Sequence, residues 1–256
     1  METKTLLKPT LEIIEKYLHF KVGPTECSIP YFNNKTIKTR VALRTYVGKG
    51  NPEDIREELE SIIIKSKIDV RSFDPQSLKK LLTDSGLGIE CSGLCYHILD
   101  TESQTRNLGS LSKKINFINC SGIIGKIRCS IRPTENCDVK TFADNANSKI
   151  IEIKDILPGD IITMKSERDE RDHILTIIKV EYKDTKPTKL HYVHSVAYPE
   201  DGLYSTGVRT GEISIIDENL PITQAEWFEG NNKGYANLLF TRANKSQTEI
   251  RRLNWF

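Results

Sequence analysis

The sequence predicts an α+β protein in which helices come first and an antiparallel sheet follows. Before residue 90, apolar side chains recur at helical spacing, whereas after residue 148 short runs rich in Ile, Val, Thr and Tyr alternate with turn residues. Strands that follow one another through short turns pair as antiparallel neighbours, and helices grouped ahead of them pack on the sheet. The 256 residues, of which 38% are hydrophobic, suffice for a substantial core in one or two domains.

Three helices are expected in the first part of the chain, at residues 10–20, 52–67 and 74–83. In the first, Leu11, Ile14 and Leu18 share one face. The second and third each begin with a capping residue and a proline, Asn51 before Pro52 and Asp74 before Pro75, a pair typical of a helix start.

Strands are expected in the second part, near residues 149–153, 160–164, 173–182, 190–196, 212–216 and 236–241, with a last one at 248–253. The separators are short turn or charged segments. Residues 101–148 are rich in Gly, Asn and Ser and are predicted to form a long loop on the substrate side with one short helix.

Composition limits the partners. The 37 basic and 35 acidic residues leave a net charge of +2, and no basic stripe points to nucleic acid. No apolar run approaches the ~20 residues that a membrane span needs. The first residues lack the pattern of a secretion signal, so we expect a cytoplasmic protein or export by a non-standard route. The six cysteines form no Cys-x-x-Cys pair, and we expect free thiols and no metal.

The most informative segment runs from Gly88 to Leu94, Gly-Ile-Glu-Cys-Ser-Gly-Leu. It places Cys91 after a turn, at the predicted start of a short apolar helix. Unpaired backbone N–H groups and the positive end of the helix dipole favour thiolate over thiol there. A nucleophilic role would also need a base and a group that orients the base.

The histidines supply candidates for the base and for the group that orients it. His97 follows Cys91 by six residues, a rotation of ~600° on a helix, so the two side chains point apart. His173 opens one predicted strand and the next contains His191 and His194. The latter two lie three residues apart and face opposite sides of that strand, so one of them can face Cys91 and His173.

Four short segments, in this order, resemble the motifs of the NlpC-type cysteine peptidases, papain-like and mostly bacterial enzymes that cut peptide bridges of the cell wall. The Cys91 segment resembles their Asp-Cys-Ser-Gly nucleophile motif, with Glu90 in place of Asp. Residues 158–164 resemble their Pro-Gly-Asp strand. Residues 173–177 are similar to the strand that carries their base, and residues 192–195 to the strand whose His orients it. The resemblance covers residues 88–100 and 156–217.

The resemblance implies a papain-like fold, with a nucleophile helix packed on an antiparallel sheet and with extra N-terminal helices. It implies a triad of Cys91, His173 and His194 that hydrolyses an amide bond through a thioester, without a cofactor. The implied substrate is a peptide or a peptidoglycan fragment. Tyr46, in a segment similar to the family's Tyr-x-Trp/Tyr-Gly-Gly, and Ser92 are expected at the substrate.

On this reading residues 1–45 form an N-terminal helical extension and residues 46–256 the catalytic domain. That domain would hold a helical insertion at about 51–85 and the long loop at about 101–148, which accounts for the wide spacing from Cys91 to His173. Two alternatives stay open. One is an amidase or acyltransferase of the same fold that acts outside the cell wall, and the other is a binding module without catalysis. The sequence leaves the oligomeric state open.

Overall fold

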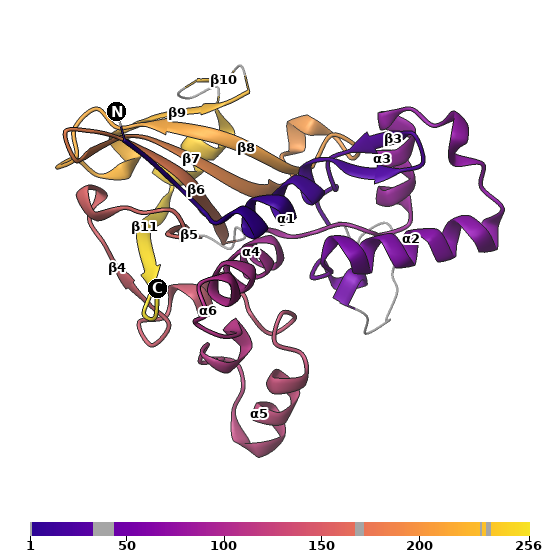
Figure 1. Ribbon diagram of the computed structural model, residues 1–256, viewed down its shortest axis with the longest axis horizontal. Coiled ribbons are helices and arrows are strands. Elements are labelled where there is room, and N and C mark those ends of the chain that lie inside the picture. The colour runs from indigo at the N-terminus through magenta and orange to yellow at the C-terminus, as the bar shows by residue number, and fades with distance from the viewer. Residues whose placement is uncertain (1, 33–43, 167–171, 231, 234–236) are drawn as a thin grey trace.

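The computed structural model describes residues 2–32, 44–166, 172–230, 232–233 and 237–256. Helices and one large sheet make up the fold, and every strand pair in that sheet is antiparallel, which confirms the predicted α+β class (Figure 1). In spatial order the strands are β10 (Asn232–Lys233), β9 (Glu226–Glu229), β8 (Gly207–Ser214), β7 (Lys186–Val196), β6 (His173–Lys183), β5 (Ile161–Ser166), β11 (Ser246–Leu253) and β4 (Ser148–Ile150).

The long hairpin of β6 and β7 is the centre of the sheet. Its two-residue turn consists of Asp184 and Thr185, with φ of 50° and 69°. Positive φ at both positions is typical of the type I′ turn, whose twist suits a hairpin. The register pairs Thr176 with Val193, so the first residues of β6 lie beside the last residues of β7. The hairpin therefore brings His173 and His194 to the same end of the sheet.

The helices are α1 (Lys8–Leu18), α2 (Pro52–Ser66), α3 (Pro75–Asp84), α4 (Cys91–Thr105), α5 (Gly122–Ile131), α6 (Val139–Ala143) and α7 (Leu238–Asn244). The three helices predicted before residue 90 are confirmed to within two residues at each start. Their predicted caps are present too, since Asn51 and Asp74 each accept a hydrogen bond from the backbone N–H three residues on. None of the helices in the described ranges is long and apolar enough to cross a bilayer.

The N-terminal residues belong to the main fold. β1 (Glu2–Thr5) pairs with the second half of β6, and a small hairpin of β2 (Phe20–Val22) and β3 (Thr25–Cys27) follows α1. Ile14 and Tyr17 of α1 lie in one buried cluster with Leu94 of α4 and Val193 of β7. The expected helical extension at 1–45 thus contributes, in its described part, a strand to the sheet and a helix to the core.

Two local predictions are wrong. The strand expected at 236–241 is instead α7, because the Asn237 side chain accepts from the N–H groups of Leu239 and Phe240 and starts a helix whose Leu239 and Ala243 are buried. The long loop expected at 101–148 contains the end of α4 and both α5 and α6.

The expectation that all thiols are free is also wrong, because Cys120 and Cys129 form a disulfide. Packing of α5 against the residues before it brings the two Cα atoms to 6.4 Å, within the range that a disulfide spans. The other four cysteines are free and buried.

Candidate active site

Cys91 is the first residue of α4, as the sequence predicted, and Glu90 is the N-cap residue. The Glu90 carbonyl accepts the first helical bond, from Leu94 N–H at 3.0 Å. The N–H groups at the start of a helix have no intrahelical acceptor, and the Cys91 N–H is one of these groups. The Glu90 side chain does not cap the helix and instead pairs with the Lys49 ammonium.

The segment at residues 46–50 lies across this helix start. Glu90 N–H donates to the Gly48 carbonyl at 3.0 Å. A Cβ atom at Gly93 would come within 2.5 Å of that same Gly48 oxygen, so only glycine fits at residue 93. The glycine after Cys91-Ser92 therefore serves the close approach of this backbone segment.

Two histidines and a glutamate form a buried hydrogen-bonded chain at the end of the central hairpin. His173 Nε2 lies 2.9 Å from His194 Nδ1, and His194 Nε2 lies 3.0 Å from Glu229 Oε2. His173 and His194 are 2% and 1% exposed, and Glu229 is 9% exposed. The Ile174 backbone N–H points to the Cys91 sulfur, so the thiol lies beside the strand residue that follows His173.

This chain fixes the direction of its protons. An ionised carboxylate only accepts, so His194 Nε2 carries the proton that it donates to Glu229. In the tautomer that continues this chain, His194 Nδ1 has the lone pair and accepts from His173 Nε2–H. The remaining ring nitrogen of His173, Nδ1, is left unprotonated. The Glu229 carboxylate, acting through the His194 ring, thus leaves Nδ1 of His173 free to accept a proton.

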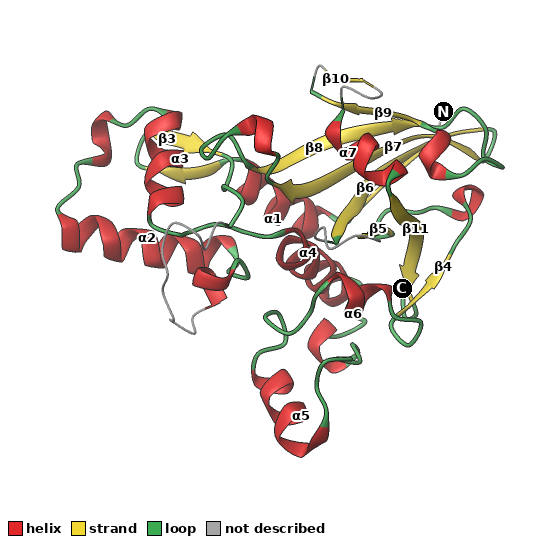
Figure 2. Ribbon diagram, turned by 180° about the vertical axis from the view of Figure 1, so that it is seen from behind, coloured by secondary structure: helices red, strands yellow, loops and turns green. Residues whose placement is uncertain are grey.

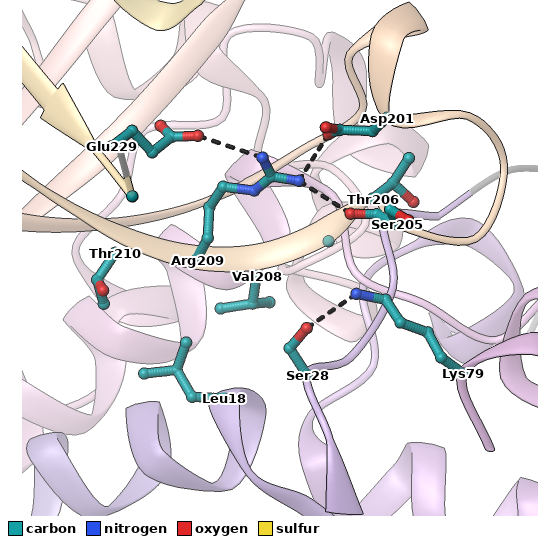
Figure 3. A pocket seen from close by; sticks show the side chains of 12 residues that line it. Leu18, Ser28, Lys79, Asp201, Ser205, Thr206, Val208, Arg209, Thr210 and Glu229 are labelled. Carbon is teal, nitrogen blue, oxygen red and sulfur yellow. Dashed lines mark hydrogen bonds and ion pairs between the residues drawn. The ribbon is translucent and has the colours of Figure 1, made fainter. Parts of the chain in front are cut away.

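Glu229 is held ionised by its neighbours. Burial opposes ionisation, but His194 and Arg209 outweigh burial and keep the pKa of Glu229 below its usual value. Arg209 Nη1 lies 3.3 Å from Glu229 Oε1, and its Nη2 lies 2.6 Å from Asp201 (Figure 3). These groups border a pocket of about 650 Å³, and Lys79 Nζ donates to Ser28 on its other side.

Cys91 and His173 are both uncharged at neutral pH. Burial, with Glu90 beside it, raises the pKa of Cys91 to about 11. Burial lowers the pKa of His173 well below 6.5, and His194 and Arg242 lower it further. The helix start that was expected to favour a thiolate is present, but the thiol is only 7% exposed and the loss of water outweighs the helix dipole.

His173 opens onto a larger pocket of about 840 Å³. Aromatic and aliphatic side chains border it together with charged groups of both signs, among them Phe32, Tyr198, Leu203, Glu200 and Arg242. A pocket of this size and mixed lining suits a peptide with apolar and charged groups.

The other residues expected at the site have internal partners. Ser92 is 3% exposed, and its hydroxyl contacts Lys49 Nζ and Glu90 Oε1, each at 2.7 Å. The Tyr46 hydroxyl donates to Glu58 of α2 at 3.2 Å, so it is directed toward that helix. Neither is among the residues that border the His173 pocket.

The two histidines nearest in sequence to the proposed triad, His191 and His97, are not part of the buried chain. His191 contacts Glu181 at 2.8 Å and Glu212 at 3.2 Å and is paired with neither His173 nor His194. The ring of His97 is bonded through Nε2 to the Lys49 carbonyl at 2.9 Å. His194 is therefore the histidine of β7 that meets His173.

The Pro-Gly-Asp motif has a structural role. Asp160 is 1% exposed and forms a two-point ion pair with Arg252, at 2.7 and 2.8 Å. Its carboxylate also accepts from Leu157 N–H at 2.7 Å, and Gly159 has a φ of +97° that glycine adopts readily. The motif therefore fixes the turn that leads into β5 and the strand pair that supports His173.

Sequence reasoning missed two residues of the site, Glu229 and Lys49. Glu229 ends the run Glu226-Trp227-Phe228-Glu229, where an acidic residue in an aromatic strand is a signal of a buried partner. Lys49 is 5% exposed and its ammonium contacts Glu90, Ser92 and the Cys137 carbonyl. Its position between Gly48 and Gly50 carries no comparable signal.

Within the described ranges, no three His, Cys, Asp or Glu side chains are grouped so that they could hold a metal ion. Comparison of the chain with protein-family models, with curated proteins and with solved structures gave no match.

Proposed function

We propose that this protein is a cysteine-type hydrolase that cleaves an amide bond, with Cys91 as nucleophile, His173 as base and His194 as the residue that orients His173. The observations that carry the proposal are the buried hydrogen-bonded chain from Glu229 through His194 to His173, and the position of the Cys91 thiol at the backbone N–H of Ile174, the residue after His173. A nucleophile, a base and an orienting group in this order are the parts that acyl transfer needs.

In the proposed reaction, His173 Nδ1 takes the thiol proton while the Cys91 sulfur bonds to the substrate carbonyl carbon. The carbonyl oxygen becomes an anion, which the Cys91 N–H stabilises. His173 then gives the proton to the leaving nitrogen as the C–N bond breaks and a thioester remains. Water, deprotonated by His173, attacks the thioester and releases the acid and the thiol. Through His194, the negative charge of Glu229 stabilises the imidazolium that forms on His173.

Because the resting thiol and imidazole are both neutral, proton transfer accompanies attack on the carbonyl instead of preceding it. The proposed enzyme thus uses general-base catalysis and not a preformed thiolate–imidazolium pair. In this respect Cys91 differs from the activated thiolate expected from its helix position alone.

The proposed substrate is a stem peptide of the bacterial cell wall. The order of the motifs supports it, as does a nucleophile helix, α4, that packs on the antiparallel strands β6 and β7, the arrangement of a papain-like fold. The mixed lining of the His173 pocket suits such peptides, which carry apolar side chains, carboxylates and amines. An amidase or acyltransferase that acts outside the wall would use the same residues.

The main competing function is a binding module in which the thiol does not react. The burial of Cys91 and its pKa of about 11 favour this alternative, because a reactive thiol usually needs access and a lowered pKa. The buried Glu229 argues against it, since binding alone gives no reason to bury a carboxylate behind two histidines.

The deciding experiment compares wild type with Cys91→Ala and Cys95→Ala on purified wall peptides, with products followed by mass spectrometry. Cys95 is the matched control, since it is also buried and lies one turn along the same helix. We expect wild type and Cys95→Ala to release fragments that together contain one added water, and Cys91→Ala to release none with an unchanged far-UV spectrum. Cleavage by Cys91→Ala would overturn the proposed nucleophile, and intact peptides with wild type would overturn the substrate.

A further inference from the structure

Helix α5 presents an apolar face to solvent. Ile123, Ile124, Ile127 and Ile131 are 79%, 84%, 55% and 72% exposed. At 100° per residue, these four side chains fall within an arc of about 100° on the helix. Cys129 lies on the opposite side, is 1% exposed and is joined to Cys120. The helix is therefore attached by its narrow inner side, and its isoleucine stripe faces outward.

The same part of the chain is strongly basic. Between Glu102 and Glu135 there are six Lys or Arg residues and no Asp or Glu, while the rest of the chain has the other 31 basic and all 35 acidic residues, a net charge of −4. One of the six, Arg106, pairs with Glu102. The other five are exposed and, among the residues that the structure describes, have no ion-pair partner: Lys113, Lys114, Lys126, Arg128 and Arg132. On α5 itself, Arg128 and Lys126 flank the isoleucine stripe on its two sides.

The position of α5 makes this surface accessible. In both views the helix lies at the far end of a projection, away from the large sheet and from α2 and α3 (Figures 1 and 2). A flat surface could meet the isoleucine stripe without meeting the sheet. An outward apolar stripe with basic residues along its edges is typical of a helix that lies in a membrane interface.

We propose that the α5 projection docks on an anionic lipid bilayer, with the four isoleucines inserted at the boundary between head groups and acyl chains. The five exposed basic side chains would contact lipid phosphates, which attract Lys and Arg close to the surface. This inference concerns a surface separate from the histidine chain and does not depend on the proposed hydrolase activity.

Two other kinds of partner fit the exposed face of α5 less well than a bilayer does. A symmetric pair of copies would bring each Lys126 and Arg128 close to the same residues of the second copy, and like charges would repel. In an interface with a protein partner, Trp, Tyr and Arg at the centre usually contribute most of the binding energy, whereas the exposed stripe of α5 consists of isoleucine. An anionic bilayer meets both the aliphatic stripe and the positive charge.

The test is co-sedimentation of the full chain with vesicles of phosphatidylcholine and phosphatidylglycerol, and with vesicles of phosphatidylcholine alone. The α5 variant combines Ile123→Ser, Ile124→Ser, Ile127→Ser and Ile131→Ser. The control variant carries Ile64→Ser, Ile150→Ser and Ile216→Ser, at isoleucines that are 76%, 60% and 67% exposed elsewhere. All seven positions are exposed, so both variants should fold, which circular dichroism checks.

We expect wild type and the control variant to bind the anionic vesicles, and the α5 variant to bind at least ~10-fold more weakly. Binding should weaken with salt and on neutral vesicles. In Ile124→Trp, added vesicles should shift the fluorescence to shorter wavelength. The proposal would be overturned if wild type did not bind the vesicles, or if the α5 variant bound them as well as wild type does. It would also be overturned if neither protein bound vesicles and the α5 variant instead lost a self-association that wild type shows.

Discussion

Glu229→Gln tests whether the carboxylate at the end of the histidine chain controls the site. The substitution keeps the size of the side chain but replaces two acceptor oxygens by one acceptor and one donor. In the native protein, Oε2 faces His194 Nε2 and the Tyr192 hydroxyl, and Oε1 faces Arg209 Nη1. Whichever way the amide turns, its NH₂ group meets a donor.

The loss of stability expected for Glu229→Gln follows from these contacts. One buried donor left without an acceptor costs about 1–3 kcal/mol, and loss of the negative charge weakens each remaining bond by about 1 kcal/mol. Arg209 keeps Asp201 as its ion-pair partner, which limits the loss on that side. We therefore expect Glu229→Gln to lower the free energy of unfolding by about 3 kcal/mol. Loss of the group that sets the His194 proton should lower turnover by about 10- to 100-fold.

Glu212→Gln is the matched control. Glu212 also pairs with a histidine of β7, His191, at 3.2 Å and with Lys189 at 2.9 Å, but its side chain is 41% exposed. Exposed ion pairs contribute little, so we expect a change within about 0.5 kcal/mol and unchanged turnover. Urea denaturation of wild type and both variants measures the stability difference, and wall-peptide cleavage measures turnover.

The pH dependence gives a further check. The pKa of Glu229 is lowered on folding, so its contribution to stability is complete above its ordinary value of about 4.5 and is lost as the pH falls below it. The stability gap between wild type and Glu229→Gln should therefore narrow at acidic pH. Equal effects of Glu229→Gln and Glu212→Gln, or full turnover in Glu229→Gln, would refute the role of the buried carboxylate.

Three other outcomes follow from the same geometry. His194→Ala should lower turnover by about 10²–10⁴-fold, whereas His191→Ala should leave it nearly unchanged, and the reverse order in a cleavage assay would reassign the orienting residue. Because the reactive forms of Cys91 and His173 are neutral, kcat/KM should rise with pH only below 6.5, where His173 loses its proton. It should then stay level up to the Cys91 pKa of about 11. A maximum near pH 6 would instead indicate a thiolate–imidazolium pair of these two residues. Alkylation of Cys91 by iodoacetamide, followed by mass spectrometry, should be slow at pH 7 and speed up with pH, and rapid labelling at pH 6 would contradict the buried neutral thiol.

Much of the local structure could be predicted because its signals are local. Asn51 and Asp74 mark helix starts by bonding to backbone groups three residues away, and the strands around His173 and His194 are encoded by their own β-branched residues. Where the local signal was ambiguous the prediction failed, as at α7, whose apolar residues suit a strand or a helix until the Asn237 cap is considered.

The sequence by itself determined the α+β class, the start of a helix at Cys91 and the set of histidines from which a base could come. Only the tertiary structure decided that His194 and not His191 meets His173, because the register of a long hairpin makes that choice. It also added Glu229, which is 35 residues from His194 in the chain and whose side chain reaches His194 across the intervening strand β8. Finally, the tertiary packing buries Cys91, which keeps its thiol neutral, and it leaves the α5 isoleucines exposed to solvent. Periodicity and caps depend on neighbours in sequence, whereas burial and side-chain partners depend on how distant segments pack.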